Sequence, residues 1–509
     1  MTPRKYIGWG LLALLALGIG NFAIGNIQTR GSLGKVAQGG TSADSGVREL
    51  MARNVLFDAL QGGAPPKTRL SAIRSLTEMA KPGKDPAAFK QLLQMLKDPD
   101  TETMQQKTHP VRDAAKAAVA SVGTLYPDPL LDAAKDADGG IRDQSREALK
   151  LIGAKMQTEM AARLGDSALR APLGDILAGI GPGTVGLVAP YLSLTELDKL
   201  KDKPDDLAAA KLQLIEIMGK YKVEEAAKAV LPFEKDPDPN VQRAVLTSLA
   251  NIAHPIGEPV LRAALTNPDT DASARAAAAV TLGAFGTTDA NNAMVTALSD
   301  FDLAVADAAA SGLARAAATN DATARLAISR GLASPDPAVR ARAAFATSGM
   351  TKTDLAAKAI SDPDAGVRAA AATAIGDILA KPNAAPRSAA EIGPLVTTLR
   401  DKDGAVAEAA QRALVKLGAV AVPAVAVLLS DAEDTTAYYA VRTLSQIGLP
   451  SYETVAQTAQ SGKPGARWAV VALGELGDVR AKPVLESLTT SPDPATAEAA
   501  TDALAKISG

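Results

Sequence analysis

A sequence pattern that repeats after 28 residues restricts the possible folds of this chain more than any other feature. In residues 336–379 an Asp-Pro turn leads into Val339-Arg340 and an Ala-rich stretch, and the same order returns with Val367-Arg368 (368 − 340 = 28). The segment 354–360, between the two Ala-rich stretches, has the composition of another helix. Two helices per repeat at this period predict a solenoid, in which each repeat packs on its neighbours.

The same pattern runs along the whole chain with a mean period of about 33 residues, (508 − 80)/13. We count back from the end of the second helix of each repeat, which is position zero. Positions −1, −4, −8 and −12 are apolar or small and lie on one face of a helix. Glycine at zero is expected to turn the chain through positive φ. The zero positions are Ala80, Gly123, Gly153, Gly181, Gly219, Ala253, Gly286, Ala317, Thr351, Leu379, Gly418, Gly448, Gly477 and Ser508.

This pattern resembles the HEAT repeat, and more narrowly the short bacterial form of phycobilisome-lyase-like HEAT proteins. The phrases that carry the resemblance include Asp98-Pro99-Asp100, Val111-Arg112 followed by Val122-Gly123, and Ile141-Arg142 followed by Ile152-Gly153. The resemblance implies an all-α fold, an α-solenoid (HEAT/armadillo-like superhelix) of about fourteen two-helix repeats over residues 47–509. Since HEAT arrays mostly serve as binding surfaces, it implies little about activity.

The resemblance also implies a ladder of polar contacts between repeats. Arginine recurs at position −11 and aspartate recurs in the preceding turn, and in the HEAT family such residues join neighbouring repeats. An anion-binding stripe is the alternative. The last four repeats carry alanine at −11, so the ladder is expected to lapse there. The residues are Arg69, Arg112, Arg142, Arg170, Arg275, Arg340 and Arg368, with Asp98, Asp236, Asp336 and Asp362, against Ala407, Ala437, Ala466 and Ala497.

The N-terminus predicts a hydrophobic helix in residues 1–27. Arg4 and Lys5 precede residues 6–27, which carry no charge and would span about 31 Å as a helix. A retained membrane anchor is the first interpretation. A cleaved signal peptide is the second, because residues 23–25 are small enough for a peptidase, and a buried core helix is the third. The Gly/Ser-rich residues 28–46 predict a flexible linker.

The anchor and signal readings both place the solenoid on the extracytoplasmic side. The anchor makes it single-pass and membrane-attached, and the signal peptide makes it secreted or periplasmic. Arg30 and Lys35 on the far side weaken the charge bias that sets this orientation.

Composition excludes several kinds of chemistry. The 54 Lys and Arg nearly balance the 56 Asp and Glu, which argues against a nucleic-acid partner. The chain has no cysteine, and its two histidines, His109 and His254, each stand beside a proline without a second ligand nearby. Residues 165–169 superficially match the start of a lipase motif but predict a helix cap, and residues 179–183 lack the Lys of a phosphate loop. We therefore predict no catalytic residue, no metal and no cofactor.

One surface cluster is a candidate partner-binding site. Position −9 holds Tyr439 and Trp468 in two consecutive repeats, and position −6 holds Arg412 and Arg442. Residues three apart share a helix face, which in a HEAT superhelix faces inward. Tyr, Trp and Arg are enriched at binding hot spots. The alternative is that the aromatic rings pack against neighbouring helices, with Tyr438 or Tyr452 filling gaps.

Two functions remain open from the sequence. The first is a non-enzymatic, membrane-tethered and monomeric scaffold that binds a protein partner along the inner surface of the solenoid. The second is a lyase-like or accessory protein of an enzyme complex, which the resemblance to the phycobilin-lyase-like HEAT family implies. The absence of cysteine and the scarcity of histidine disfavour a covalent tetrapyrrole site. A third reading, binding of cell-wall glycan, requires more exposed aromatic residues than the chain has.

Overall fold

The computed structural model describes residues 53–54, 56–60, 64–81, 85–98, 109–382 and 388–508. The predicted anchor or signal segment 1–27 and the linker 28–46 lie outside these residues, so both remain predictions. Within the described residues every regular element is an α-helix or a 3₁₀-helix, and no strand occurs. The predicted all-α solenoid of helix pairs is confirmed.

The chain divides into two compact units, residues 1–244 and 245–509, and each is described by itself. In the first unit, the second helices of the repeats are α5 (Pro66–Ala80), α7 (Pro110–Val122), α9 (Gly139–Ile152), α11 (Ser167–Ile180), α14 (Pro204–Met218) and α16 (Pro239–Ile252), which crosses the unit boundary. The first helices are α6 (Pro86–Gln94), α8 (Pro127–Ala133), α10 (Gln157–Ala162), α12 (Val185–Val188), α13 (Leu194–Asp198) and α15 (Glu224–Val230). Short 3₁₀ turns join them: η1 (Met95–Lys97), η2 (Gly123–Leu125), η3 (Gly153–Met156), η4 (Pro182–Thr184), η5 (Ala189–Leu192) and η6 (Leu231–Phe233).

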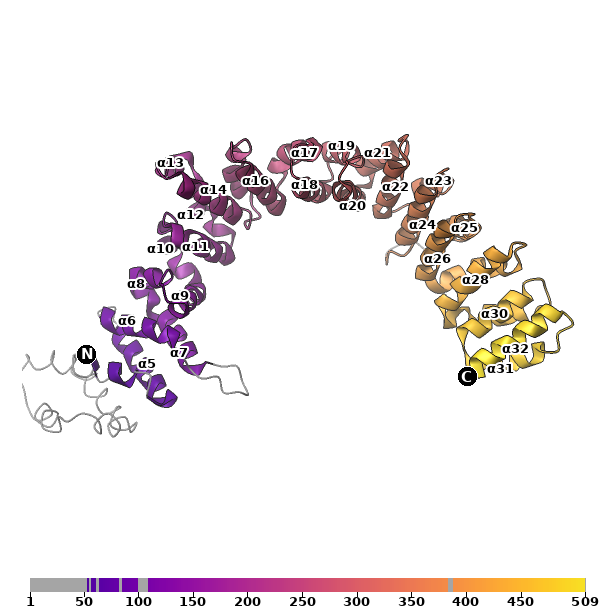
Figure 1. The fold of residues 1–509 in the computed structure, drawn as a ribbon, viewed down its shortest axis with the longest axis horizontal. Helices are drawn as coiled ribbons and strands as arrows, with labels where there is room; N and C mark the ends of the chain where they lie inside the picture. Colours follow the sequence, from indigo (N-terminus) through magenta and orange to yellow (C-terminus); the bar gives the residue numbers. More distant parts are fainter. Residues whose placement is uncertain are drawn as a thin grey trace, which may run out of the picture. The chain divides into compact units, whose positions relative to one another are not determined.

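The second unit has two layers of helices (Figure 1). The second-helix layer contains α18 (Ala272–Phe285), α20 (Leu303–Thr319), α22 (Pro337–Ala346), α24 (Ala365–Leu379), α26 (Gly404–Leu417), α28 (Asp434–Ile447), α30 (Ala466–Leu476) and α32 (Pro494–Ser508). The first-helix layer contains α17 (Glu258–Thr266), α19 (Thr288–Ala297), α21 (Asp321–Leu332), α23 (Asp354–Ala359), α25 (Ala389–Thr398), α27 (Val422–Ala426), α29 (Tyr452–Ala459) and α31 (Lys482–Leu488). The 3₁₀ turns are η7 (Pro255–Gly257), η8 (Thr347–Gly349), η9 (Gly418–Ala421), η10 (Val427–Ser430), η11 (Leu449–Ser451) and η12 (Val479–Ala481).

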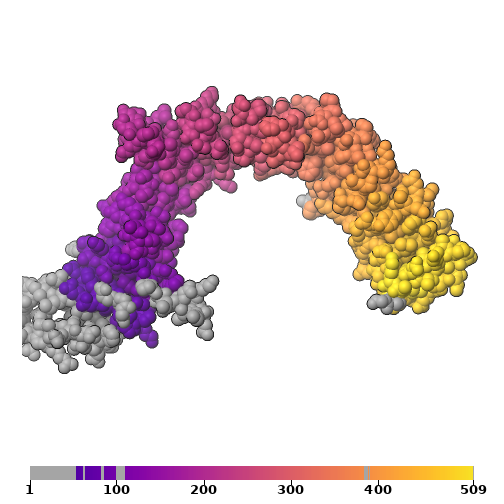
Figure 2. Space-filling view, viewed as in Figure 1, coloured from indigo at the N-terminus to yellow at the C-terminus, as the bar shows by residue number. Residues whose placement is uncertain are grey.

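The predicted apolar face of the second helices forms the core between the layers. Leu414, Leu444 and Leu473 stand at position −4 of three successive repeats, and each is fully buried. In the space-filling view the unit forms one surface without gaps between repeats, from pink at α17 to yellow at α32 (Figure 2). Stability in such an array comes from each repeat and its contacts with the next.

The second helices end where the template predicts, but only some of the glycines there adopt positive φ. Every predicted zero position falls within about two residues of the end of a second helix or of the 3₁₀ turn that continues it. Gly286 and Gly477 adopt positive φ, as expected, and Ala253 does so without being glycine. The expectation is wrong for Gly123 and Gly219, whose φ values are −59° and −58°. At Gly123 the chain passes directly into η2, and a Cβ would lie 2.7 Å from Leu130 Cδ2, so space rather than φ requires glycine there.

Small residues bring the second helices close together. A Cβ at Gly283 would lie 2.5 Å from the Gly312 carbonyl oxygen, and one at Gly376 would lie 2.5 Å from Ala413 Cβ. The pair Gly474 and Ala503 repeats the contact, with 2.8 Å between the added Cβ and Ala503 Cβ. In each pair the glycine stands at position −3 and its partner at −5 of the next repeat. Neighbouring second helices therefore pack almost backbone to backbone.

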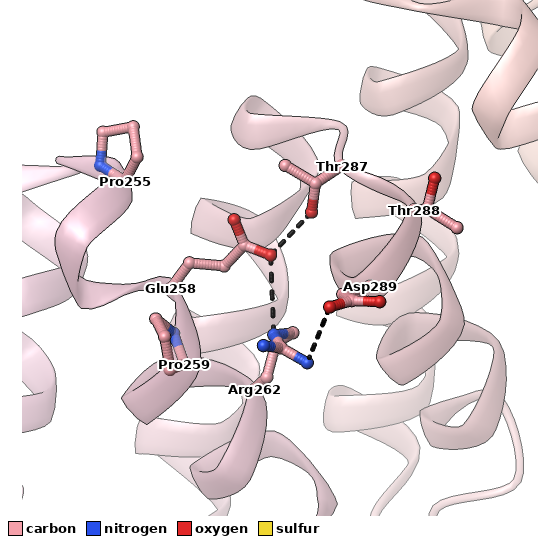
Figure 3. A pocket seen from close by; sticks show the side chains of 7 residues that line it. All are labelled: Pro255, Glu258, Pro259, Arg262, Thr287, Thr288 and Asp289. Carbon is pink, nitrogen blue, oxygen red and sulfur yellow. Dashed lines mark hydrogen bonds and ion pairs between the residues drawn. The ribbon is translucent and has the colours of Figure 1, made fainter.

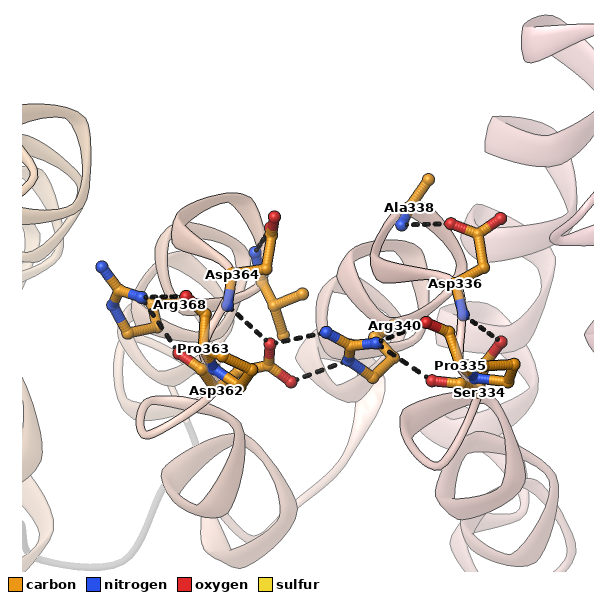
Figure 4. A network of polar contacts seen from close by, with 10 residues as sticks. Ser334, Pro335, Asp336, Ala338, Arg340, Asp362, Pro363, Asp364 and Arg368 are labelled. Atoms are coloured by element: carbon orange, nitrogen blue, oxygen red, sulfur yellow. Dashed lines mark hydrogen bonds and ion pairs between the residues drawn. The ribbon is translucent and has the colours of Figure 1, made fainter.

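The predicted ladder of polar contacts joins successive repeats (Figure 4). Arg340 donates to both carboxylate oxygens of Asp362, at 2.8 and 2.9 Å, and also to the carbonyl oxygens of Ser334 and Pro335 in its own turn. Arg368 binds Asp401 in the same way, at 2.6 and 2.9 Å. These hydrogen bonds lower the pKa of both carboxyl groups below the ordinary value. Each guanidinium thus fastens its own turn to the turn of the next repeat.

The ladder also departs from the prediction at several residues. Arg69 and Arg275 reach Asp98 and Asp300 in the turn of the next repeat, as the pattern implies, whereas Arg170 reaches Asp206, which lies inside α14. Arg142 instead donates within its own turn, and Lys211 rather than an arginine pairs with Asp236. Asp336 is not a ladder partner but caps α22 through the amide of Ala338. No ion pair of Arg112 is seen among the described residues.

The ladder changes form in the last repeats. Ala407 replaces the arginine that would reach Asp431. Arg400, two residues after the end of α25, forms the ion pair with Asp431 instead, at 2.7 Å. The Arg400 side chain is 47% exposed, against 10% for Arg368. The prediction that the ladder lapses is therefore correct for the arginine at position −11, but Asp431 still forms an ion pair with another arginine.

Candidate partner-binding surface

The four predicted binding residues lie on three successive second helices of the second unit. Arg412 is on α26, Tyr439 and Arg442 are on α28, and Trp468 is on α30. These helices pack side by side, with α28 between the other two. The repeat pattern therefore placed the residues on one layer correctly, and their role in binding remains a prediction.

The two aromatic rings at position −9 are only partly available to a partner. Tyr439 and Trp468 are half-buried and pack against the core of the last repeats. A Cβ at Gly404 would lie 3.4 Å from Tyr439 Oη, so the ring reaches the first turn of α26. Their outer edges remain on the surface, as in the predicted site, while their bodies have the packing role of the alternative interpretation.

The two predicted arginines are in different environments. Arg412 is 69% exposed and forms a long ion pair of 3.8 Å with Glu408, one turn earlier on α26. Arg442 lies over the ring of Tyr438, with 5.8 Å between Cζ and the ring centroid. No hydrogen bond, ion pair or cation–π contact joins any two of the four predicted residues.

Sequence reasoning missed two residues of this surface, Tyr438 and Arg467. Tyr438 is 50% exposed and contacts Tyr439 edge to face at 6.0 Å, so it does not fill a gap. Arg467 lies over Trp468, with 4.9 Å between Cζ and the centroid. Both stand at position −10, which is four residues before −6 and shares its face. Tyr452, by contrast, is buried and donates from Oη to the Arg480 carbonyl oxygen at 2.9 Å. We call Tyr438, Tyr439, Arg442, Arg467 and Trp468 the aromatic–arginine surface.

An open groove of about 470 Å³ lies on the first-helix layer between α17 and α19 (Figure 3). Glu258 accepts a hydrogen bond from Thr287 Oγ1 at 2.6 Å and lies 3.5 Å from Arg262. Arg262 also lies 3.4 Å from Asp289. These polar groups pair with one another, and Thr287 Oγ1 also caps α19, where it accepts from the amide of Ala290 at 3.1 Å.

Residues that the sequence analysis considered for metal binding, nucleophilic catalysis or phosphate binding have structural roles in the described part of the chain. His254 Nδ1 accepts from the amide of Ile256 at 3.4 Å, and Asp166 caps α11 through the amide of Ala168. Gly181 ends α11 with φ 136°. The described residues contain no group of three or more His, Cys, Asp or Glu that could hold a metal ion.

A comparison with known protein families agrees with this architecture. The family model for HEAT repeats matches residues 421–505, which include α28 and α30. Among solved structures, Kap121p bound to Ste12p is similar at 14% identity and TM-score 0.46, over 89% of this chain and 56% of that one. Importin beta is similar at 14% identity and TM-score 0.42, over 89% and 72% of the two chains.

The chain spans little more than half of Kap121p, and likeness at this level carries no information about function. No curated protein matches the sequence. Residues 421–505 thus match the HEAT family, while the narrower resemblance to phycobilisome-lyase-like proteins remains a prediction.

One apolar run among the described residues, Gly404–Ser430, is long enough to cross a membrane. It consists of α26, η9, α27 and η10, and half of its most apolar window is buried inside the unit. Its apolar character is that of a core segment.

Proposed function

We propose that the protein is a non-enzymatic scaffold that binds a protein partner on the second-helix layer of residues 245–509. The observation that carries this proposal is the aromatic–arginine surface on α28 and α30. Aromatic residues make up 3% of the chain, yet three of them stand with two arginines on adjacent helices. Tyr, Trp and Arg are the residue types most enriched at protein-binding hot spots.

The groove between α17 and α19 on the first-helix layer lacks the features of a small-ligand site. The groove of Figure 3 is open, and its charged groups are already paired with one another. Small-molecule sites are usually enclosed, apolar cavities with a few unpaired polar groups. No observation favours the lyase-like alternative, which rests on sequence resemblance alone.

Site-directed photo-crosslinking tests the proposal in cells that express the full chain. A crosslinking phenylalanine analogue at position 438, on the exposed second-helix face, is compared with the same analogue at position 326. Leu326 is 69% exposed on α21 of the first-helix layer and is a matched control. We expect a discrete protein adduct from position 438 that is absent from position 326.

The double substitution Tyr439→Ala and Trp468→Ala then checks the specificity of the adduct. The adduct should be lost while the far-UV circular dichroism stays unchanged. An adduct from position 326 alone, or one that survives the double substitution in a folded protein, would contradict the proposal.

We further propose that residues 6–27 hold this scaffold at a membrane with the repeats on the extracytoplasmic side. The support is the length of this uncharged segment after Arg4 and Lys5. Carbonate extraction of membranes tests it: the full chain should stay in the pellet, and its intact mass should include residues 1–27. Release into the supernatant with a shortened N-terminus would favour the cleaved signal peptide instead.

A further inference from the structure

Four arginines lie over aromatic rings in the described residues, and they fall into two kinds. Arg275 over Phe301 and Arg480 over Tyr452 have their charge matched by a carboxylate, since Arg275 pairs with Asp300 at 3.0 Å and Arg480 with Asp478 at 2.6 Å. The other two arginines are Arg442 and Arg467, and no carboxylate among the described residues lies within ion-pair distance of either. Both unmatched arginines belong to the aromatic–arginine surface.

The two unmatched arginines stand on neighbouring helices. Side-by-side helices lie about 8–10 Å apart, and the two side chains extend from positions −6 and −10 of these helices. An aromatic ring centroid lies within about 6 Å of Cζ of each arginine, and no hydrogen bond or ion pair to a described residue engages the N–H groups of either one. A planar group held in this way presents a fork of donors that matches a carboxylate.

Several carboxylates lie on or next to the helices that adjoin the two arginines. On α26, Glu408 is paired with Arg412, and on α30, Glu475 is paired with Lys506. Asp434 begins α28 two turns before Arg442, about 12 Å away along the axis. Before α32, Asp493 is held by Thr496. Its pKa is lowered first by that hydrogen bond, with a smaller contribution from Arg467. On α32, Glu498 and Asp502 are exposed, and neither they nor the other described carboxylates on the adjoining helices form an ion pair with Arg442 or Arg467.

We infer that the aromatic–arginine surface binds an acidic linear segment of the partner protein, with apolar or aromatic side chains between its carboxylates. An extended chain advances about 3.3 Å per residue, so carboxylates two or three residues apart match the spacing of the two helices. The exposed half of Tyr438 and the edge of Trp468 offer the apolar contact between them. This inference rests on the proposed function and names the chemistry of its partner.

A protein segment fits this surface better than a nucleic acid or an anionic membrane. Those ligands require many phosphate contacts from a broad basic face. Here only two guanidinium groups are unmatched, and Glu408 and Asp434 stand at the border of the surface. The net charge of the chain is −2.

Selection from a random 12-residue peptide display library tests the inference on the immobilised full chain. A double variant, Arg442→Gln with Arg467→Gln, serves for counter-selection. We expect enriched peptides to carry two Asp or Glu two or three residues apart with an apolar residue between or beside them. Enrichment of neutral or basic peptides, of acidic peptides that bind the double variant equally well, or of none would overturn the inference.

Single variants measured with an enriched peptide sharpen the test. Arg442→Gln and Arg467→Gln should each weaken binding about tenfold, and raising NaCl from low to high concentration should weaken the wild type more than either variant. Arg480→Gln is the matched control, because Arg480 also lies over a ring but is already paired with Asp478. It should leave the affinity within about twofold. An equal loss in Arg480→Gln would overturn the inference.

A single-stranded DNA oligomer and phosphatidylglycerol vesicles are tested in parallel with the same variants. Tighter, arginine-dependent binding to either one than to the enriched peptide would overturn the inference. The proposed function fails separately, when no adduct forms at position 438. An adduct to a segment without acidic residues would leave the scaffold role standing and overturn only the acidic partner.

Discussion

The repeats around α22 and α24 differ from the last repeats, α28 to α32, in where their arginines are placed. In the former, Arg340 and Arg368 stand at position −11, where they are largely buried and bind the aspartate of the next turn. In the latter, position −11 is alanine, and Arg442 and Arg467 lie over aromatic rings on the exposed face of the second helices. The same residue type therefore joins repeats in one region and remains available for a partner in the other.

Breaking one ladder contact should have the largest effect. Arg368→Met leaves Asp401 nearly buried and without its bidentate partner, and we expect a loss of about 3 kcal/mol in unfolding free energy. Arg400→Met in the last repeats should cost below about 1 kcal/mol, because Arg400 is half exposed. Urea denaturation followed by circular dichroism measures both, and hydrogen exchange in α24 and α26 locates the loss. Equal losses would show that the two regions do not differ as described.

Overpacking the last repeats should have the next largest effect, because close helix packing continues there while the arginine at position −11 is absent. Gly474→Val places side-chain atoms where even a Cβ would lie 2.8 Å from Ala503 Cβ, and we expect a loss of about 2 kcal/mol with faster hydrogen exchange in α32. Because Gly393 on α25 precedes Pro394, whose ring disfavours a helical residue with a Cβ before it, Gly179→Ala on α11 is a better matched control than Gly393→Ala. A Cβ at Gly179 meets nothing within 4 Å, so that alanine should stabilise the helix by about 0.5–1 kcal/mol. A neutral Gly474→Val would remove close packing as the explanation.

Acid should reduce the difference between wild type and Arg368→Met. The hydrogen bond from Arg368 is the first cause of the lowered pKa of Asp401, so its stabilising contribution is complete above the unfolded-state pKa of about 3.9. That contribution is lost as pH falls from there through the folded-state pKa. Urea curves at pH 7, 4 and 3 should therefore converge for the two proteins.

The same titration distinguishes the last repeats. The pKa of Asp431 is lowered first by the Glu433 amide and less by Arg400, so Arg400→Met should leave most of the local pH dependence unchanged. Convergence as large as that of Arg368→Met would contradict this assignment.

The sequence by itself determined the helix pairs, their fourteen ends and most of the ladder. These features depend on side chains at fixed spacings within one repeat or between two adjacent repeats, so a periodic pattern is sufficient to read them. It also determined which helices carry the candidate residues, because Tyr439, Trp468, Arg412 and Arg442 occupy equivalent positions of consecutive repeats. The departures at Arg142, Lys211 and Arg400 depend on side-chain reach, which the spacing does not encode.

Only the tertiary structure decided which side of each helix remains exposed. Positions −9 and −10 differ by 100° around the helix axis, and packing between layers buries most of Tyr439 and Trp468 while it leaves Tyr438 at the surface. The structure alone also showed that Arg442 and Arg467 lack a carboxylate while Arg480 has one. That distinction depends on contacts among side chains in three dimensions. A repeat pattern gives the position of a residue along its helix, but it does not show which side chains surround that residue.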